Sequence, residues 1–198
     1  MKPEIMIFRA TAPEYEWFEN ARVHRPLKNQ AGSEPTMSSR QFIGMLESEF
    51  KGVCQDSITN NYIIAGIRKA HYYFVAFDHA KQEICGILLL HLYKTWSPKF
   101  KDHTFGYVDL VCSRCKTFGK RLMTAAETYC RGLGALFMRI NSVPEQIGFY
   151  TALGYEHKVQ PCDPTSVARP MTYVRNRGHR SNLEFNDIGA KMTKCLRT

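Results

Sequence analysis

The residues whose types and spacing suggest chemistry lie in one stretch, YVDLVCSRCKTFGKRLM, which occupies residues 107–123. An apolar strand is expected to end at Cys112, and a helix is expected to begin near Phe118 after a short turn. The first backbone N–H groups of a helix have no partner within it, and the helix dipole adds partial positive charge there. Four basic side chains flank the turn: Arg114, Lys116, Lys120 and Arg121. This pattern is typical of a site that binds a phosphate or pyrophosphate group.

Asp109 lies inside the apolar strand, where an unpaired carboxylate is costly to bury. Strand alternation places it on the same face as Tyr107 and Val111. Two interpretations stay open. Either a neighbouring Arg or backbone N–H satisfies this carboxylate, or the carboxylate orients an amine and takes its proton. Glu83 and Tyr107 are weaker candidates for the proton transfer.

These side chains must be positioned by a series of strands and helices. Strands are expected at residues 4–10, 71–78, 83–94, 105–112, 135–141, 155–158 and 171–175. Helices are expected from Thr11, at residues 38–53, 58–70 and 118–131, and from 142 to about 153. Residues 24–37 and 95–103 are expected to be loops. Consecutive antiparallel strands followed by alternating strands and helices predict an α/β (α+β) fold with a mixed sheet covered by helices on both faces.

The composition fits one globular domain with a basic extension. The chain has 198 residues, 44% of them hydrophobic, and a net charge of +9. We expect the domain to span residues 1–175. The extension, residues 176–198, is expected to pack on it as a helix whose apolar side is formed by Leu183, Phe185, Ile188, Met192 and Leu196. The positive charge is uneven along the chain, so a nucleic-acid partner is not required. The oligomeric state is not indicated.

Seven cysteines show no disulfide framework spacing, so free thiols in a reducing compartment are expected. Cys112 and Cys115 have the CxxC spacing, but a second pair is absent, and no metal site is expected. The sequence shows neither a signal peptide nor an apolar run of the ~20 residues that a membrane span needs. We therefore expect an intracellular protein, in the cytoplasm or nucleus, with no membrane partner.

Three phrases together resemble the GNAT superfamily of acetyl-CoA-dependent N-acetyltransferases. Residues 114–119, RCKTFG, are similar to the family signature R/Q-x-x-G-x-G/A, with Thr117 in place of its first glycine. Residues 149–155, FYTALGY, resemble the family's FY-x-x-x-G-[FY] element, and IFRATAPEYEW at residues 7–17 resembles its first strand and helix. The resemblance covers roughly residues 4–175. The strand phrase YVDLVCS also resembles GNAT proteins of large DNA viruses.

The resemblance implies a GNAT fold with a splayed parallel pair of strands, and direct acetyl transfer from acetyl-CoA to an amine. Tyr150 would hydrogen-bond the leaving sulfur, and Asp109 would be the catalytic base. A backbone N–H of Leu110 or Val111 would face the thioester oxygen. The implied cofactor-binding residues are Leu110, Val111, Cys112, Arg114, Cys115, Lys116, Thr117, Phe118, Gly119, Lys120, Asn141 and Phe149. The side chain of Thr117 would crowd a position where the backbone approaches phosphate.

The resemblance also implies that the acceptor binds near the first helix, the loop 24–37 and residues 159–170, and Tyr107 is a further candidate to contact it. Three carboxylates on that helix, Glu14, Glu16 and Glu19, slightly favour a small polyamine or diamine, although they also suit the start of a helix dipole. A protein lysine or N-terminal acetyltransferase is an alternative. A protein of another class is also an alternative, namely a catalytically silent scaffold whose basic tail binds nucleic acid or a protein partner.

Overall fold

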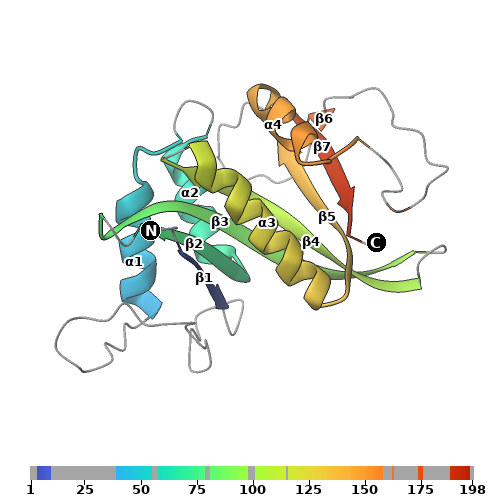
Figure 1. The fold of residues 1–198 in the computed structure, drawn as a ribbon, viewed down its shortest axis with the longest axis horizontal. Coiled ribbons are helices and arrows are strands. Elements are labelled where there is room, and N and C mark those ends of the chain that lie inside the picture. The colour runs from blue at the N-terminus through green and yellow to red at the C-terminus, as the bar shows by residue number, and fades with distance from the viewer. Residues whose placement is uncertain are drawn as a thin grey trace. The chain divides into compact units, whose positions relative to one another are not determined.

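The computed structural model describes residues 4–9, 39–54, 58–78, 81–97, 101–114, 116–157, 162, 174–175 and 188–196 (Figure 1). The chain divides into two compact units. The first contains Met1–Leu90 and Leu110–Ala125, and the second contains His91–Asp109 and Ala126–Thr198. The described strands follow one another in the sheet order β1-β2-β3-β4-β5-β7-β6.

The strands are β1 (Glu4–Arg9), β2 (Tyr72–Asp78), β3 (Glu83–Ser97), β4 (Lys101–Ser113), β5 (Ala135–Ser142), β6 (Val174–Arg175) and β7 (Ile188–Cys195). The helices are α1 (Ser39–Phe50), α2 (Asn60–Lys69), α3 (Lys116–Gly132) and α4 (Ile147–Ala152), with a 3-10 turn, η1, at Pro144–Gln146. The pairs β1–β2, β2–β3, β5–β7 and β6–β7 are antiparallel, and β4–β5 is parallel. The expected mixed sheet is therefore confirmed.

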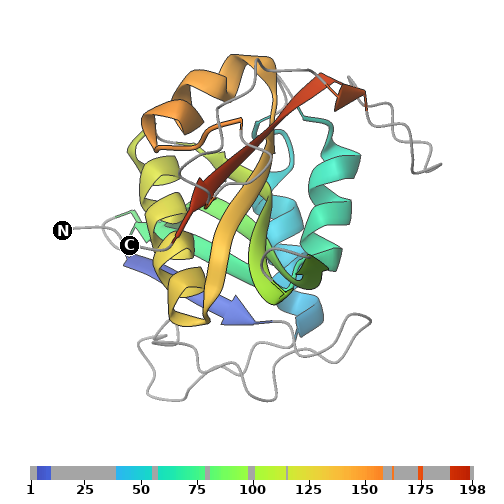
Figure 2. The same ribbon diagram turned by 90° about the vertical axis from the view of Figure 1, so that its right-hand side faces the viewer.

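In the first unit, α1 and α2 pack against the antiparallel strands β1, β2 and β3 (Figure 2). Phe42, Leu46 and Phe50 recur every four residues and are buried, which is why this sequence forms an amphipathic helix. The side chain of Thr59 caps α2 by accepting a hydrogen bond from the backbone N of Tyr62 at 3.4 Å. Every residue of β2 from Tyr72 to Phe77 is buried, as expected for a strand covered on both faces.

In the second unit, β5 lies between β4 and β7, and β7 (red) runs beside it in Figure 2. Lys194 Nζ of β7 lies 2.7 Å from Glu127 Oε2 of α3, and both side chains are largely buried. Tyr155 is fully buried beside this ion pair. Burial raises the pKa of Tyr155, and the negative charge of Glu127 raises it further.

Two expected elements are wrong. Residues 95–103 are mostly strand rather than loop, because β3 continues to Ser97 and β4 already begins at Lys101. The expected C-terminal helix is the strand β7. Ile188 and Met192 of β7 and Leu196 just after it are four apart, a spacing that suits both a helix and one face of a strand. The open edge of β5 decides the outcome, since it takes up β7 from Phe137–Cys195 to Ser142–Ala190.

Two other expectations are tested only in part, and three are not tested. Of the strand expected at residues 155–158, the described residues show a single bridge between Glu156 and Thr193. Of the strand expected at 171–175, residues 174–175 are described, as β6. The first expected helix and the loop 24–37 lie outside the described residues, and the domain boundary at residue 175 stays a prediction.

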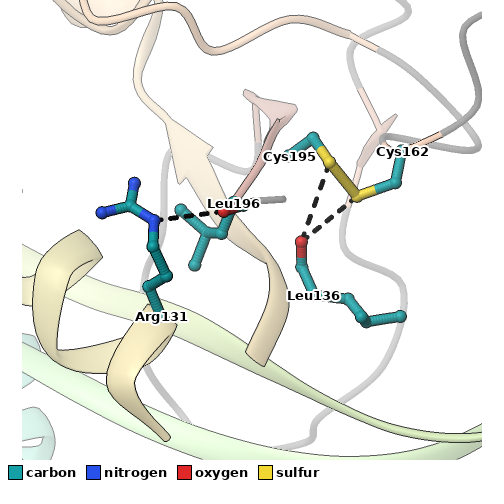
Figure 3. The surroundings of a disulfide bond; sticks show 5 residues. All are labelled: Arg131, Leu136, Cys162, Cys195 and Leu196. Atoms are coloured by element: carbon teal, nitrogen blue, oxygen red, sulfur yellow. Dashed lines mark hydrogen bonds between the residues drawn. A yellow bond between two sulfur atoms is a disulfide. The ribbon is translucent and has the colours of Figure 1, made fainter. Parts of the chain in front are cut away.

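The expectation of free thiols is wrong for four cysteines. Cys54 is bonded to Cys112 in the first unit, and Cys162 to Cys195 in the second. Figure 3 shows the second bond beside the carbonyl of Leu136. The partners are 58 and 33 residues apart in sequence, so their spacing carries no signal, and folding alone brings them together. Cys85 and Cys130 are free and buried.

Within the described residues, none of the helices combines the length and the apolar character that a membrane span requires.

Candidate functional site

The turn between β4 and α3 lies in the first unit and contains the residues expected to bind phosphate. α3 begins at Lys116, so the amides of residues 116–119 are those that a helix leaves without internal partners. Thr117 and Lys120 are exposed, whereas Phe118 and Gly119 are buried. The turn thus presents a hydroxyl, an ammonium group and helix-start amides, a set that suits a phosphate group. Cys115 lies outside the described residues, as does the side chain of Lys116.

Gly86 of β3 allows the start of α3 to lie close to the sheet. A Cβ atom at this position would come within 3.0 Å of Leu122 Cδ1 and of Ser113 Cβ, and within 3.2 Å of the carbonyl oxygen of Cys112. Ordinary Cβ contacts are 3.4 Å or longer, so a larger residue would displace the β4–α3 turn. Sequence analysis missed Gly86, because a glycine in a strand can also mark a bulge or a weak point.

Arg114 is held by the first unit itself. Its backbone N donates to the carbonyl of Cys85 at 2.9 Å. Its guanidinium donates to the carbonyls of Glu49 and Ile84 and lies 3.1 Å from Glu49 Oε2. The same group lies 5.9 Å from the centre of the Phe50 ring. The guanidinium is therefore turned toward the C-terminal end of α1, where it satisfies the carbonyl of Glu49.

Strand β4 carries the other expected cofactor-binding residues. Leu110 and Cys112 are buried in the core of the first unit, and Val111 between them is partly exposed. In the second unit, the parallel register of β4 with β5 runs through residues 104–108 and ends at the pair Val108–Ile140. Both strands continue beyond that pair, β4 to Ser113 and β5 to Ser142. Such an end of pairing leaves backbone N–H and C=O groups that an extended ligand can bind.

Asp109, the expected base, lies in the second unit next to His91. Oδ2 of Asp109 is 3.9 Å from Nε2 of His91, and both side chains are largely buried. Tyr93 stacks on the His91 ring with centroids 5.9 Å apart, and the Tyr107 ring lies 6.4 Å from it. Burial raises the pKa values of Tyr93 and Tyr107, and the negative charge of Asp109 raises both further. These tyrosines therefore stay protonated around Asp109.

Asn141 and Tyr107, expected to bind cofactor and acceptor respectively, contact each other. Asn141 Nδ2 donates to Tyr107 Oη at 3.3 Å. Arg139, two residues before Asn141, is opposite Tyr107 in the β4–β5 register. Sequence analysis missed Arg139, although an arginine inside the apolar strand ALFMRINS is as unusual as Asp109 in its own strand.

Tyr150, the expected donor to the leaving sulfur, lies on α4 in the second unit. Its ring is 4.9 Å from that of Phe149 and 6.1 Å from that of Tyr155, both edge-on. Burial raises the pKa of Tyr150 to about 12. No residue in the described part of the chain forms a hydrogen bond with its hydroxyl.

The remaining expectations are not tested. Glu14, Glu16 and Glu19 lie outside the described residues. No cluster of His, Cys, Asp and Glu that could hold a metal ion occurs among the residues that are described.

No protein-family model matches the sequence, and no curated protein matches it. Solved structures do resemble it. The catalytic domain of Tetrahymena GCN5 histone acetyltransferase, in complex with coenzyme A, has a TM-score of 0.53 at 14% identity, over 100% of this chain and 96% of that one. A protein of Lactobacillus plantarum described as an N-acetyltransferase has a TM-score of 0.53 at 15% identity over 100% of both chains. Another Tetrahymena GCN5 structure gives 0.52 at 14% identity, over 85% of this chain and 93% of that one. The chain therefore has the fold of the GNAT acetyltransferases.

Proposed function

We propose that the protein is an acetyl-CoA-dependent N-acetyltransferase that moves the acetyl group directly to a primary amine. The observation that carries this proposal is the GNAT fold, in which the parallel pair β4–β5 stops at Val108–Ile140 while β4 runs on into the helix start at Lys116. Backbone groups that no longer pair with β5 and helix-start amides thus follow each other along the chain, in the order that a pantetheine arm and its pyrophosphate require.

The residues after β4 would hold the phosphates. Thr117 and Lys120 are exposed at the start of α3 and offer a hydroxyl and an ammonium group beside the free amides. Val111 and its neighbours Leu110 and Cys112 would pair with the pantetheine arm through their backbone, since the side chains of the latter two are buried. Arg114 would act indirectly, by fixing the turn against α1, because its guanidinium is held by Glu49.

Acetyl-CoA supplies an acetyl group activated as a thioester. The acceptor nitrogen forms the new bond to the carbonyl carbon as the bond to sulfur breaks, and the nitrogen must lose its proton. Asp109 would take this proton at its carboxylate, with His91 beside it. Tyr150 would donate a hydrogen bond to the leaving sulfur. Its raised pKa, about 12, makes full proton transfer to a thiolate of pKa near ~8.5 unfavourable, so Tyr150 would act as a hydrogen-bond donor.

A small polyamine or diamine as the acceptor stays a prediction, because the three carboxylates that favour it are not among the described residues. Acetylation of a protein lysine or N-terminus is the alternative. A scaffold that binds nucleic acid stays a prediction without an observation in its favour.

An intracellular location is part of the proposal, and the two disulfides make the state of the thiols a direct test of it.

The test is release of free CoA thiol from acetyl-CoA, measured with putrescine, spermidine, a lysine-containing peptide, an arylamine and an aminoglycoside. One amine that stands out supports the transferase and names the acceptor class. Binding of acetyl-CoA is measured separately by calorimetry. A protein that neither binds acetyl-CoA nor releases thiol with any amine would contradict the proposal.

A further inference from the structure

Arg139 on β5 is a charged side chain that the fold leaves incompletely satisfied. Its guanidinium carbon lies 5.0 Å from the centre of the Phe105 ring and 5.5 Å from that of Phe137. Its Nε atom is buried and has no hydrogen-bond partner. Within the described part of the chain, no carboxylate forms an ion pair with Arg139. A buried donor of this kind is uncommon in a folded protein and points to a missing acceptor.

Lys191 on the neighbouring strand β7 adds a second positive charge. The register places it opposite Asn141, two residues from Arg139. Partial burial lowers the pKa of Lys191, and the positive charge of Arg139 lowers it further, so the two cations are within electrostatic range. No carboxylate among the described residues pairs with Lys191 either. Two like charges held together in this way favour an anion between or beside them.

Lys194 of the same strand is a cation that has a partner within the fold. Its ammonium group is 2.7 Å from the carboxylate of Glu127, and its side chain is largely buried. Adjacent side chains of a strand point to opposite faces, and Lys194 is opposite Met138 whereas Lys191 is opposite Asn141. Lys194 is therefore neutralised by a carboxylate of the fold, whereas Lys191 on the other face of β7 has no carboxylate partner among the described residues.

The same face of the second unit also carries a negative charge, that of Asp109 on β4. Tyr107 is the register partner of Arg139 and accepts a hydrogen bond from Asn141. Asp109 follows Tyr107 by two residues, and its charge acts on that tyrosine. The face thus has a carboxylate beside His91 at one place, and a guanidinium and an ammonium group one and two strands further on.

We propose that Arg139 and Lys191 form an anion-binding subsite for the acceptor, so that the acceptor is an amine that also carries an anionic group. This inference rests on the proposed acetyl transfer and gives its substrate class. The acceptor's anion pairs with Arg139 and Lys191, while its amine lies toward Asp109. A zwitterion such as an amino acid has this arrangement of charges. A polyamine does not, so the inference departs from the expectation based on the first helix.

The anion that Arg139 and Lys191 bind can be a carboxylate or a phosphate group. A guanidinium pairs with either through two parallel N–H bonds, and the aromatic rings that flank Arg139 hold its plane in place. The experiment therefore contains one comparison for each anion.

The test uses pairs of amines that differ only in the anionic group. Lysine is compared with cadaverine and tyrosine with tyramine for the carboxylate, and phosphoethanolamine with ethanolamine for the phosphate. Thiol release from acetyl-CoA gives kcat/KM for each, and calorimetry gives the affinity of each without turnover. We expect the anionic member of at least one pair to be preferred by about tenfold or more, the usual value of a hydrogen bond to a charged group.

Arg139→Met should remove this preference by raising KM for the anionic member of a pair. It should leave kcat/KM unchanged for the amine that lacks the anionic group. Arg139→Lys should keep part of it, and Lys191→Met, at an exposed position, should weaken it with little risk to folding. Lys69→Met removes an exposed charge from α2 and serves as the control. Melting temperatures of all variants identify any that fail to fold.

Equal kcat/KM values within every pair in the wild type would overturn the inference, as would a preference that Arg139→Met and Lys191→Met leave intact. If no amine is acetylated, the affinities of the amines measured by calorimetry test the subsite. Binding of an anionic amine that depends on Arg139 supports the subsite while the proposed transfer fails, and the absence of such binding overturns the subsite as well.

Discussion

The guanidinium of Arg114 lies 3.1 Å from Glu49 Oε2, and this contact joins the turn after β4 to the C-terminal end of α1. The guanidinium also donates to the backbone carbonyl of Glu49, so it is bound to both parts of one residue. In the family signature this position is expected to contact the cofactor. The contact gives Arg114 a structural role, while cofactor binding by its side chain stays a prediction, and a pair of substitutions can separate the two.

We expect Arg114→Gln to lower the free energy of unfolding by about 1–2 kcal/mol, because the pair is half-exposed but two carbonyl hydrogen bonds are lost with it. Glu49→Gln should cost less, because its backbone carbonyl remains. The double variant should be less destabilised than the sum of both. Urea unfolding measures these values. A KM for acetyl-CoA that rises at least tenfold in Arg114→Gln, with Glu49→Gln normal, would assign Arg114 to the cofactor instead.

Tyr150→Phe should lower kcat at least tenfold and leave the affinity for acetyl-CoA nearly unchanged, because in the proposed reaction the lost hydrogen bond would serve the leaving sulfur. Tyr129→Phe, on α3, is the control for removal of a tyrosine hydroxyl. A kcat equal to that of the wild type would remove Tyr150 from the mechanism.

The raised pKa of Tyr150 also predicts a pH effect. The folded protein holds this proton up to about pH 12, whereas an unfolded chain releases it near pH ~10. The protein should therefore lose stability as the pH rises between these values, and the loss should be smaller in Tyr150→Phe. Urea midpoints measured from pH 9 to 11.5 check the sign. An identical pH dependence in wild type and variant would show that Tyr150 is solvated.

Much of the fold follows from local patterns. Phe42, Leu46 and Phe50 have a helical period, and the apolar run around Leu88 is typical of a buried strand. The β4–α3 turn could be located because strand, basic residues and glycine occur together. Arg139 was missed because the feature that marks it is a buried Nε atom without a hydrogen-bond partner. Only the folded arrangement of β4, β5 and β7 reveals this feature.

The C-terminal strand and the disulfides could not be predicted from the sequence, and the physical reason is the same for both. The spacing of Ile188, Met192 and Leu196 suits a helix as well as a strand, and the choice depends on an edge formed by residues 135–142. Cys54 and Cys112 are far apart in sequence, and they lie together in the core where residues of α1, α2 and β4 pack. Such long-range relationships leave no mark in the local sequence.

Gly86→Ala should destabilise the protein by about 1–3 kcal/mol, because the new Cβ would press on Leu122, Ser113 and the carbonyl of Cys112. It should also raise KM for acetyl-CoA, since these contacts hold the start of α3. Gly44→Ala is the matched control. Gly44 is an exposed residue of α1 with no atom within 4 Å of its would-be Cβ, and alanine there should stabilise by about 0.5–1 kcal/mol. Equal effects at both positions in thermal melts would contradict the close packing of α3 on β3.

The disulfide Cys54–Cys112 closes a span of 58 residues and holds the α1–α2 connection against the end of β4. Loss of a cross-link over a span of this length costs about 4 kcal/mol if it acts by constraining the unfolded chain. We expect Cys54→Ser to lower the melting temperature, and excess reductant to lower that of the wild type to a similar value. In reductant the difference between the two proteins should nearly vanish, which separates the lost bond from the changed side chain.

Four of the six cysteines that the structure describes are bonded, and Cys115 lies outside the described residues. If those two bonds are the protein's disulfides, the protein denatured without reductant should titrate 7 − 4 = 3 thiols. Seven thiols would show that the bonds do not form, and would favour the reducing compartment that the cysteine spacing predicts. Three thiols would place the protein where disulfides persist. The folded protein should react less than the denatured one in either case, because Cys85 and Cys130 are buried and burial raises the pKa of Cys130 to about 12.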